Sequence, residues 1–161
     1  MEREIRRNQN NLIILGTGVL AFAVWTVVRS LIQYMLQSTE IKNLVSGMVA
    51  EDQVNWVMTV IVIIIVVTLA VDLILRMIVG FSARAEGKGK KKRLGYLVAA
   101  VILIVVHVLN ISQYIMLVIA DTEQIMECII GAIIEVTSVI TLLQLIIASV
   151  RFKKLTAQKS Q

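Results

Sequence analysis

The stretch VNWVMTVIVIIIVVTLAVDLILRMIV, from Val54 to Val79, is an apolar run in which only Asp72 and Arg76 carry charge. A helix rises about 1.5 Å per residue, so this run is long enough to cross a hydrocarbon core of about 30 Å. Three further stretches resemble it, and we expect membrane spans at about residues 12–36, 54–79, 94–120 and 122–150. The sequence therefore predicts an all-α membrane protein, a four-transmembrane-helix antiparallel bundle that forms one integral membrane domain over residues 1–161.

The composition excludes an ordinary soluble domain. Hydrophobic residues make up 58% of the chain and charged residues 17%, whereas soluble domains carry about 25% charged residues. The one cysteine, Cys128, has no second cysteine to bond with, and a single thiol is no metal site. Neither HExxH nor G-x-S-x-G occurs, so metalloprotease and serine-hydrolase chemistry has no support. We therefore expect no cofactor and no metal, and an enzymatic activity is disfavoured.

Basic residues alternate from one side of the predicted spans to the other. Thirteen lie in the N-terminus, the middle loop and the C-terminal tail, and only Lys42 lies in the other connections. Short basic loops stay in the cytoplasm. Both termini and the middle loop are therefore predicted to be cytoplasmic, in a multi-pass protein of the plasma (inner) membrane.

The middle loop, FSARAEGKGKKKR, contains a dense basic patch. Its residues are Lys88, Lys90, Lys91, Lys92 and Arg93. We interpret this patch as an orientation signal that also attracts the anionic headgroups of the cytoplasmic leaflet. A dedicated lipid or nucleic-acid site is the alternative, but no nucleic acid is expected because no aromatic residues interleave with the lysines.

The first span also has the form of a secretory signal, with Ala21 to Ala23 as a cleavage site. The apolar character continues past this point through Trp25 and Val28. We therefore favour a membrane-spanning helix over a cleaved signal.

The connection between the first two spans has a helical pattern. Apolar residues recur there at i, i+3, i+4, i+7 and i+8, namely Ile41, Leu44, Val45, Met48 and Val49. Ser38 is a candidate N-cap. We predict a short helix over about residues 39–50 that lies flat in the outer interface, with an unstructured connector as the alternative.

Charged and amide side chains also occur within the spans, where a charge costs about 2.5–3.5 kcal/mol on insertion scales. Their distance from the span centres sorts them into two layers. The outer layer contains Arg29, Glu135, His107, Asn110 and Gln113, and the inner layer contains Asp72 and Arg76. Two pairs are predicted: Arg29 with Glu135 across the first and fourth spans, and Asp72 with Arg76 one helical turn apart.

Each of these groups has a structural and a functional interpretation. An Arg29–Glu135 pair is either a clamp between helices or part of an ion or substrate pathway. His107 is either a satisfied core histidine or a proton relay, and Arg76 is expected to extend towards the inner headgroups. Gly95 begins a small-xxx-small spacing that allows close helix packing. Polar faces on both sides of the fourth span fit a homo-oligomer or a larger membrane complex.

Two functions remain open from the sequence. The first is an accessory, regulatory or assembly subunit that acts through helix–helix contacts and carries no catalytic chemistry. The alternative is an oligomeric transporter or channel for ions or small molecules that uses Arg29, Glu135, His107 and Asn110. The two differ in whether these side chains line a water-accessible cavity or close on one another.

Overall fold

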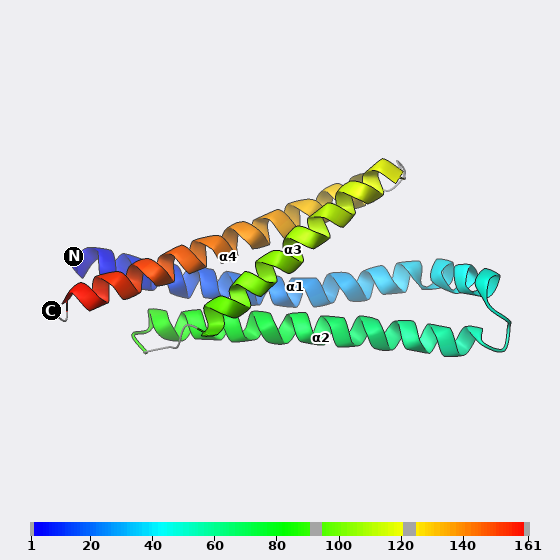
Figure 1. Ribbon diagram of the computed structural model, residues 1–161, viewed down its shortest axis with the longest axis horizontal. Coiled ribbons are helices and arrows are strands. Elements are labelled where there is room, and N and C mark those ends of the chain that lie inside the picture. Colours follow the sequence, from blue (N-terminus) through cyan, green and yellow to red (C-terminus); the bar gives the residue numbers. More distant parts are fainter. Residues whose placement is uncertain (1, 91–94, 121–124, 160–161) are drawn as a thin grey trace. The chain divides into compact units, whose positions relative to one another are not determined.

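The computed structural model describes residues 2–90, 95–120 and 125–159. These ranges form four helices and contain no strand: α1 (Glu2–Met48), α2 (Val54–Gly87), α3 (Gly95–Ala120) and α4 (Ile125–Lys159), as Figure 1 shows. Each helix is long and apolar enough to cross a membrane. The predicted all-α fold with four membrane-spanning helices is therefore confirmed. The side of the membrane on which the termini lie stays a prediction.

The helices are longer than the predicted spans. α1 has 47 residues, a length of about 70 Å at 1.5 Å per residue, which is more than twice the thickness of the hydrocarbon core. α4 has 35 residues and ends in the polar sequence RFKKLTAQK. The polar ends of these helices therefore extend beyond the membrane-spanning turns.

The short interfacial helix expected at residues 39–50 is not a separate element, and this prediction is wrong. Its residues as far as Met48 continue α1 without a break. Ser38, expected to cap a new helix, instead donates its hydroxyl to the carbonyl of Met35 at 3.2 Å, within the same helix. The chain has no proline, and no glycine lies between Gly18 and Gly47. The ladder of backbone hydrogen bonds therefore meets no residue that would interrupt it.

The chain divides into two compact units, which we describe separately. Unit 1 consists of Met1–Phe22 and Leu75–Gln161, and unit 2 consists of Ala23–Ile74. Unit 1 contains the hydrophobic core and nearly all of the buried polar groups. The prediction of one integral membrane domain over the whole chain stays a prediction.

The core of unit 1 lies between α3, α4 and the adjoining turns of α1 and α2. α3 and α4 pack antiparallel, because Tyr96 near the start of α3 contacts Ser149 of α4 and His107 further along α3 contacts Glu135. Buried apolar side chains fill the space between the helices: Val19, Val79, Ala83, Tyr96, Ala99, Ala100, Leu103, Leu142 and Leu145.

Glycines allow α1 and α2 to approach closely within unit 1. A Cβ atom at Gly16 would lie 2.7 Å from the carbonyl oxygen of Gly80, and one at Gly80 would lie 2.8 Å from the carbonyl oxygen of Gly16. About two turns further along α2, a Cβ at Gly87 would lie 2.7 Å from the carbonyl oxygen of Gln9. Only residues without a side chain fit at these positions, so the three glycines form a seam between two backbones.

The predicted small-xxx-small contact at Gly95 is wrong for this glycine. A Cβ at Gly95 would meet no atom of the described residues within 4 Å. Gly95 is the first residue of α3 and has not yet entered the packed part of the helix. Ala99, four residues later, is in the core.

A glycine turn ends α2. Gly89 has φ of 81°, the amide of Lys90 donates to the carbonyl of Ala85 at 3.0 Å, and the amide of Gly89 donates to the carbonyl of Glu86 at 2.9 Å. This pair of hydrogen bonds around a left-handed residue is a Schellman motif. It holds Glu86 in the last turn of α2.

Unit 2 is a pair of apolar helical segments with a small interior. Val45 and Val54 are buried, whereas Trp25 and Trp56 are exposed. Its outer surface is apolar along α2. Such a surface suits contact with lipid or with another membrane helix.

Candidate functional site: two buried polar clusters in unit 1

His107 and Glu135 form a polar contact between the predicted spans of α3 and α4 in unit 1. His107, on α3, is 1% exposed, and its Nδ1 atom meets Oε2 of Glu135 on α4. With the carboxylate as the acceptor, Nδ1 is the donor. Glu135 is half-buried. The pair joins α3 to α4 across the helix interface, where a single polar side chain would lack a partner.

A small cavity lies beside this pair. Its volume is about 10 Å³, close to the minimum that one water molecule needs. Its lining residues come from all four helices: Val19, Phe22, Arg76, Leu103, His107, Ser138, Thr141 and Leu142. The Nε2 atom of His107 is buried and makes no hydrogen bond within the described ranges. The cavity is therefore a pocket with room for at most one small polar molecule.

Arg76 lines the same cavity. It is 4% exposed, so its side chain is covered by protein, and the expectation that it extends to the headgroups is wrong. The sequence interpretation assigned Arg76 to the inner layer and His107 to the outer layer, yet both line one cavity. Helix packing accounts for this difference, because depth counted along isolated spans ignores how far each helix is shifted along its neighbour. The Asp72–Arg76 pair stays a prediction.

The other predicted polar residues are more exposed or belong to unit 2. Asn110 is half-buried and Gln113 is exposed on α3. Arg29 and Asp72 are half-buried in unit 2. The predicted contact between Arg29 and Glu135 joins residues of different units and stays a prediction. In the structure, Glu135 contacts His107. Sequence analysis placed these two residues in the same layer but did not predict that they form a pair.

A second polar cluster lies where α2, α3 and α4 meet. The hydroxyl of Tyr96 donates to Oε2 of Glu86, and the hydroxyl of Ser149 donates to Oε1 of Glu86 at 3.1 Å. The two hydroxyl oxygens are 2.7 Å apart. Nζ of Lys153 lies 3.6 Å from Oε1 of Glu86 and 5.5 Å from the centre of the Tyr96 ring. These four residues form the Glu86 cluster.

The Glu86 cluster offsets the cost of an acidic residue at an unfavourable place. Glu86 is 2% exposed and lies in the last turn of α2, where the negative end of the helix dipole disfavours a carboxylate. Two hydroxyl donors and the Lys153 ammonium compensate for this. The cluster therefore connects three helices through one carboxylate.

Sequence analysis missed the Glu86 cluster. The available signal was Glu86 itself, the only acidic residue within the basic segment FSARAEGKGKKKR. Its partners Tyr96, Ser149 and Lys153 carry no motif, because they come together only when α3 and α4 pack against the end of α2.

The basic patch of the middle loop is only partly described. Lys88 and Lys90 are exposed. Lys91, Lys92 and Arg93 lie outside the described residues. Its attraction to anionic headgroups stays a prediction.

The chain matches no protein family model, no curated protein and no solved structure. The observations that bear on function are therefore the His107–Glu135 pair and the Glu86 cluster. A buried histidine–carboxylate contact and a carboxylate with two hydroxyl donors are suited to holding helices together, and a histidine is also able to accept a proton.

Proposed function

We propose that this protein is a non-catalytic membrane subunit that acts through helix–helix contacts, in an accessory, regulatory or assembly role. The observation that carries the proposal is the closed contact between His107 and Glu135. The sequence-based alternative needs these side chains to line a path for water or ions. In unit 1, His107 and Glu135 instead contact each other between α3 and α4.

The size of the adjoining cavity supports this proposal. A space of about 10 Å³ holds a single water molecule at most, and a permeation path needs a continuous series of such sites. The Glu86 cluster likewise engages its carboxylate with Tyr96, Ser149 and Lys153. These buried polar groups thus stabilise the packing of α2, α3 and α4 and leave the outer faces to apolar contacts.

The outer faces offer a large apolar surface. Val108 and Ile129 are about half exposed on α3 and α4, and so is Ile78 on α2. In a bilayer such residues contact lipid tails or the helices of another protein. Because lipid tails are as apolar as leucine, helix association there depends on packing and on a few polar groups.

A cysteine-accessibility scan tests the proposal. Cys128→Ser provides a background without other thiols, and single cysteines replace Leu103, His107 and Ser138 around the cavity. We expect a membrane-impermeant maleimide, added from either side, to leave all three unlabelled. Lys90→Cys is the positive control, because Lys90 is exposed and lies outside the predicted spans. Labelling of the cavity positions at a rate near that of the control would contradict the proposal.

The transporter alternative is favoured by one observation. Nε2 of His107 is buried without a hydrogen bond in the described part of the chain, beside the cation Arg76. A histidine with one free nitrogen is able to take up and release a proton. Proton flux into vesicles that contain the purified protein, abolished by His107→Leu, would favour this alternative over the accessory role.

A further inference from the structure

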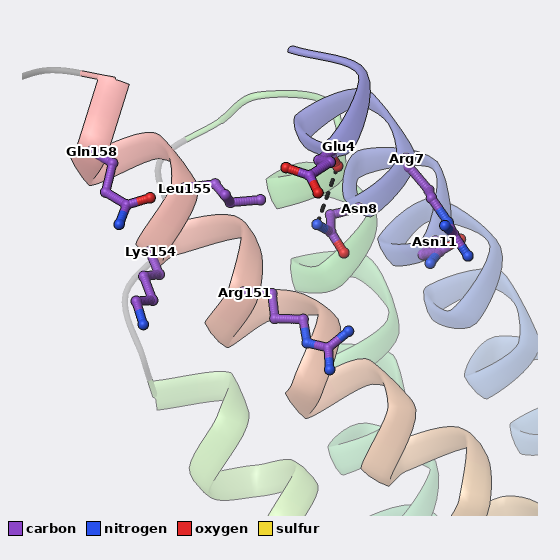
Figure 2. A pocket seen from close by; sticks show the side chains of 8 residues that line it. All are labelled: Glu4, Arg7, Asn8, Asn11, Arg151, Lys154, Leu155 and Gln158. Atoms are coloured by element: carbon purple, nitrogen blue, oxygen red, sulfur yellow. Dashed lines mark hydrogen bonds between the residues drawn. The ribbon is translucent and has the colours of Figure 1, made fainter. Parts of the chain in front are cut away.

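A groove in unit 1 runs between the first turns of α1 and the last turns of α4 (Figure 2). It has a volume of about 480 Å³, within the range of small-molecule sites. Its lining residues are Glu4, Arg7, Asn8, Asn11, Arg151, Lys154, Leu155 and Gln158. Neither the His107–Glu135 pair nor the Glu86 cluster contributes to it.

The groove has the charge of an anion site. Arg7 comes from α1, and Arg151 and Lys154 come from α4, whereas Glu4 is the one acidic residue of the lining. All three basic side chains are exposed, so a ligand is able to reach them. In Figure 2, the side chain of Arg151 extends from α4 on the side that faces α1.

The amide groups add hydrogen-bonding capacity. The Nδ2 atom of Asn8 donates to the backbone carbonyl of Glu4 at 3.1 Å, which orients this amide along α1. Asn11 and Gln158 are exposed, and their amide nitrogens are donors that suit an anionic oxygen. Arginine in particular binds phosphate oxygens with two parallel hydrogen bonds.

The groove continues into a second pocket that is more apolar at its far end. A second pocket of about 430 Å³ shares Asn8, Asn11 and Arg151 with the first. Its other lining residues are mostly apolar: Ile14, Leu15, Gln144, Ile147 and Ala148. Arg151 thus lies at the junction of a basic pocket and an apolar one.

We propose that this groove binds one anionic phospholipid. The phosphate lies at Arg151, with Arg7 and Lys154 as further cations, and an acyl chain follows Ile14 and Ile147 towards the membrane interior. An amphipathic ligand matches both halves of the groove, whereas a free phosphate would use only the basic half. The predicted cytoplasmic position of both termini places the groove at the leaflet that carries anionic lipids.

Lipid retention during purification tests this site. The full-length protein is reconstituted in nanodiscs of phosphatidylcholine with about one-fifth phosphatidylglycerol, extracted in mild detergent, and its bound lipid is counted by native mass spectrometry. We expect one phosphatidylglycerol to stay bound. The double substitution Arg7→Gln, Arg151→Gln should lower this retention about tenfold or more, because each basic residue near anionic lipid adds substantially to binding.

The matched control is Lys88→Gln, Lys90→Gln, which removes the same charge from two exposed lysines outside the groove. If this control variant retains as much phosphatidylglycerol as the native protein, the result supports the groove as the binding site. Equal losses in both double variants would overturn the proposal in favour of general attraction to the basic surface. Ile147→Trp should also reduce lipid retention, since a larger side chain narrows the second, more apolar pocket.

Two further experiments distinguish a bound phospholipid from other ligands of the groove. Inorganic phosphate at millimolar concentration should not displace the bound lipid, and displacement would identify the groove as a site for the free anion. In the unmodified protein, a photoactivatable phosphatidylglycerol should label peptides that contain Asn8–Leu15 or Gln144–Gln158. Labelling confined to other segments, or groove peptides cross-linked to protein in place of lipid, would overturn the proposal.

Discussion

His107 of α3 and Glu135 of α4 contact each other through Nδ1 and Oε2, although 28 positions separate them in the chain. The contact lies in the interface that α3 and α4 form as an antiparallel pair. It gives each side chain a partner at a depth where an isolated polar group is costly.

Removing one partner of this contact should destabilise the protein more than removing both. We expect Glu135→Leu to lower the free energy of unfolding by about 1–3 kcal/mol, because His107 then remains buried with no acceptor at Nδ1. The double variant His107→Leu, Glu135→Leu should recover part of this loss. Titration with a denaturing detergent, followed by circular dichroism, measures the difference.

Gln113→Ala is the control for this comparison, because Gln113 lies exposed on the same helix. It should change the unfolding free energy by less than about 0.5 kcal/mol. If the double variant loses as much unfolding free energy as the two single variants lose together, the two side chains do not stabilise each other.

Glu86→Ala should be among the most damaging single substitutions in unit 1. It leaves the hydroxyls of Tyr96 and Ser149 without their shared acceptor and the ammonium of Lys153 without its ion-pair partner. We expect a loss of about 2–4 kcal/mol, because each unsatisfied buried group costs about 1–3 kcal/mol. The measurement is the same detergent titration.

Ser149→Ala should cost less than Glu86→Ala, about 1 kcal/mol, since it removes one donor and leaves the carboxylate with Tyr96 and Lys153. Glu51→Ala is the control for the loss of a carboxylate, because Glu51 is exposed. A Glu86 variant as stable as the Glu51 variant would refute the structural role of this cluster.

Alanine at the glycine seam should separate α1 and α2. Gly16→Ala places a Cβ 2.7 Å from the carbonyl oxygen of Gly80, so the two backbones must move apart, at a cost of about 1–3 kcal/mol. Gly47→Ala is the matched control, because a Cβ there meets nothing within 4 Å. It should stabilise α1 by up to about 1 kcal/mol through helix propensity alone.

These two substitutions should therefore shift the thermal unfolding temperature in opposite directions. A differential scanning measurement in detergent detects both. A Gly16→Ala variant as stable as the native chain would mean that α1 and α2 are not in close contact at this position.

Reporter fusions should establish the orientation of the chain. The strong bias of basic residues predicts a cytoplasmic signal from fusions after Lys90 and at the C-terminus, and an external signal from a fusion near Gly47. Alkaline phosphatase and green fluorescent protein, active on opposite sides of a bacterial inner membrane, provide the readouts. An external C-terminus would reverse the assignment of the phospholipid groove to the cytoplasmic leaflet.

Sequence analysis predicted the four helices because hydropathy is a local property. The run from Val54 to Val79 is apolar whatever the rest of the chain does, and its helix in the structure, α2, begins at Val54. The helix ends were less accurate. α2 continues to Gly87 and ends at the glycine turn at Gly89, and α1 continues through the expected loop to Met48.

The candidate site was predicted only in part. His107 and Glu135 were both identified as polar groups at membrane depth, but Glu135 was paired with Arg29, because these two are the only opposite charges on different helices at a matched predicted depth. The rotation of each helix about its axis decides which residues meet, and this rotation depends on how all side chains of the interface pack. The Glu86 cluster and the glycine seam were missed for the same reason.

The sequence alone determined that this is a helical membrane protein with four spans, since the length and apolar character of each span are independent of tertiary contacts. Only the tertiary structure decided the partners of its buried polar groups. It joined Glu135 to His107, covered Arg76 beside the same cavity and brought Tyr96 and Ser149 to Glu86. Each of these contacts joins residues on different helices, and their meeting depends on helix shift and rotation, which no local pattern encodes.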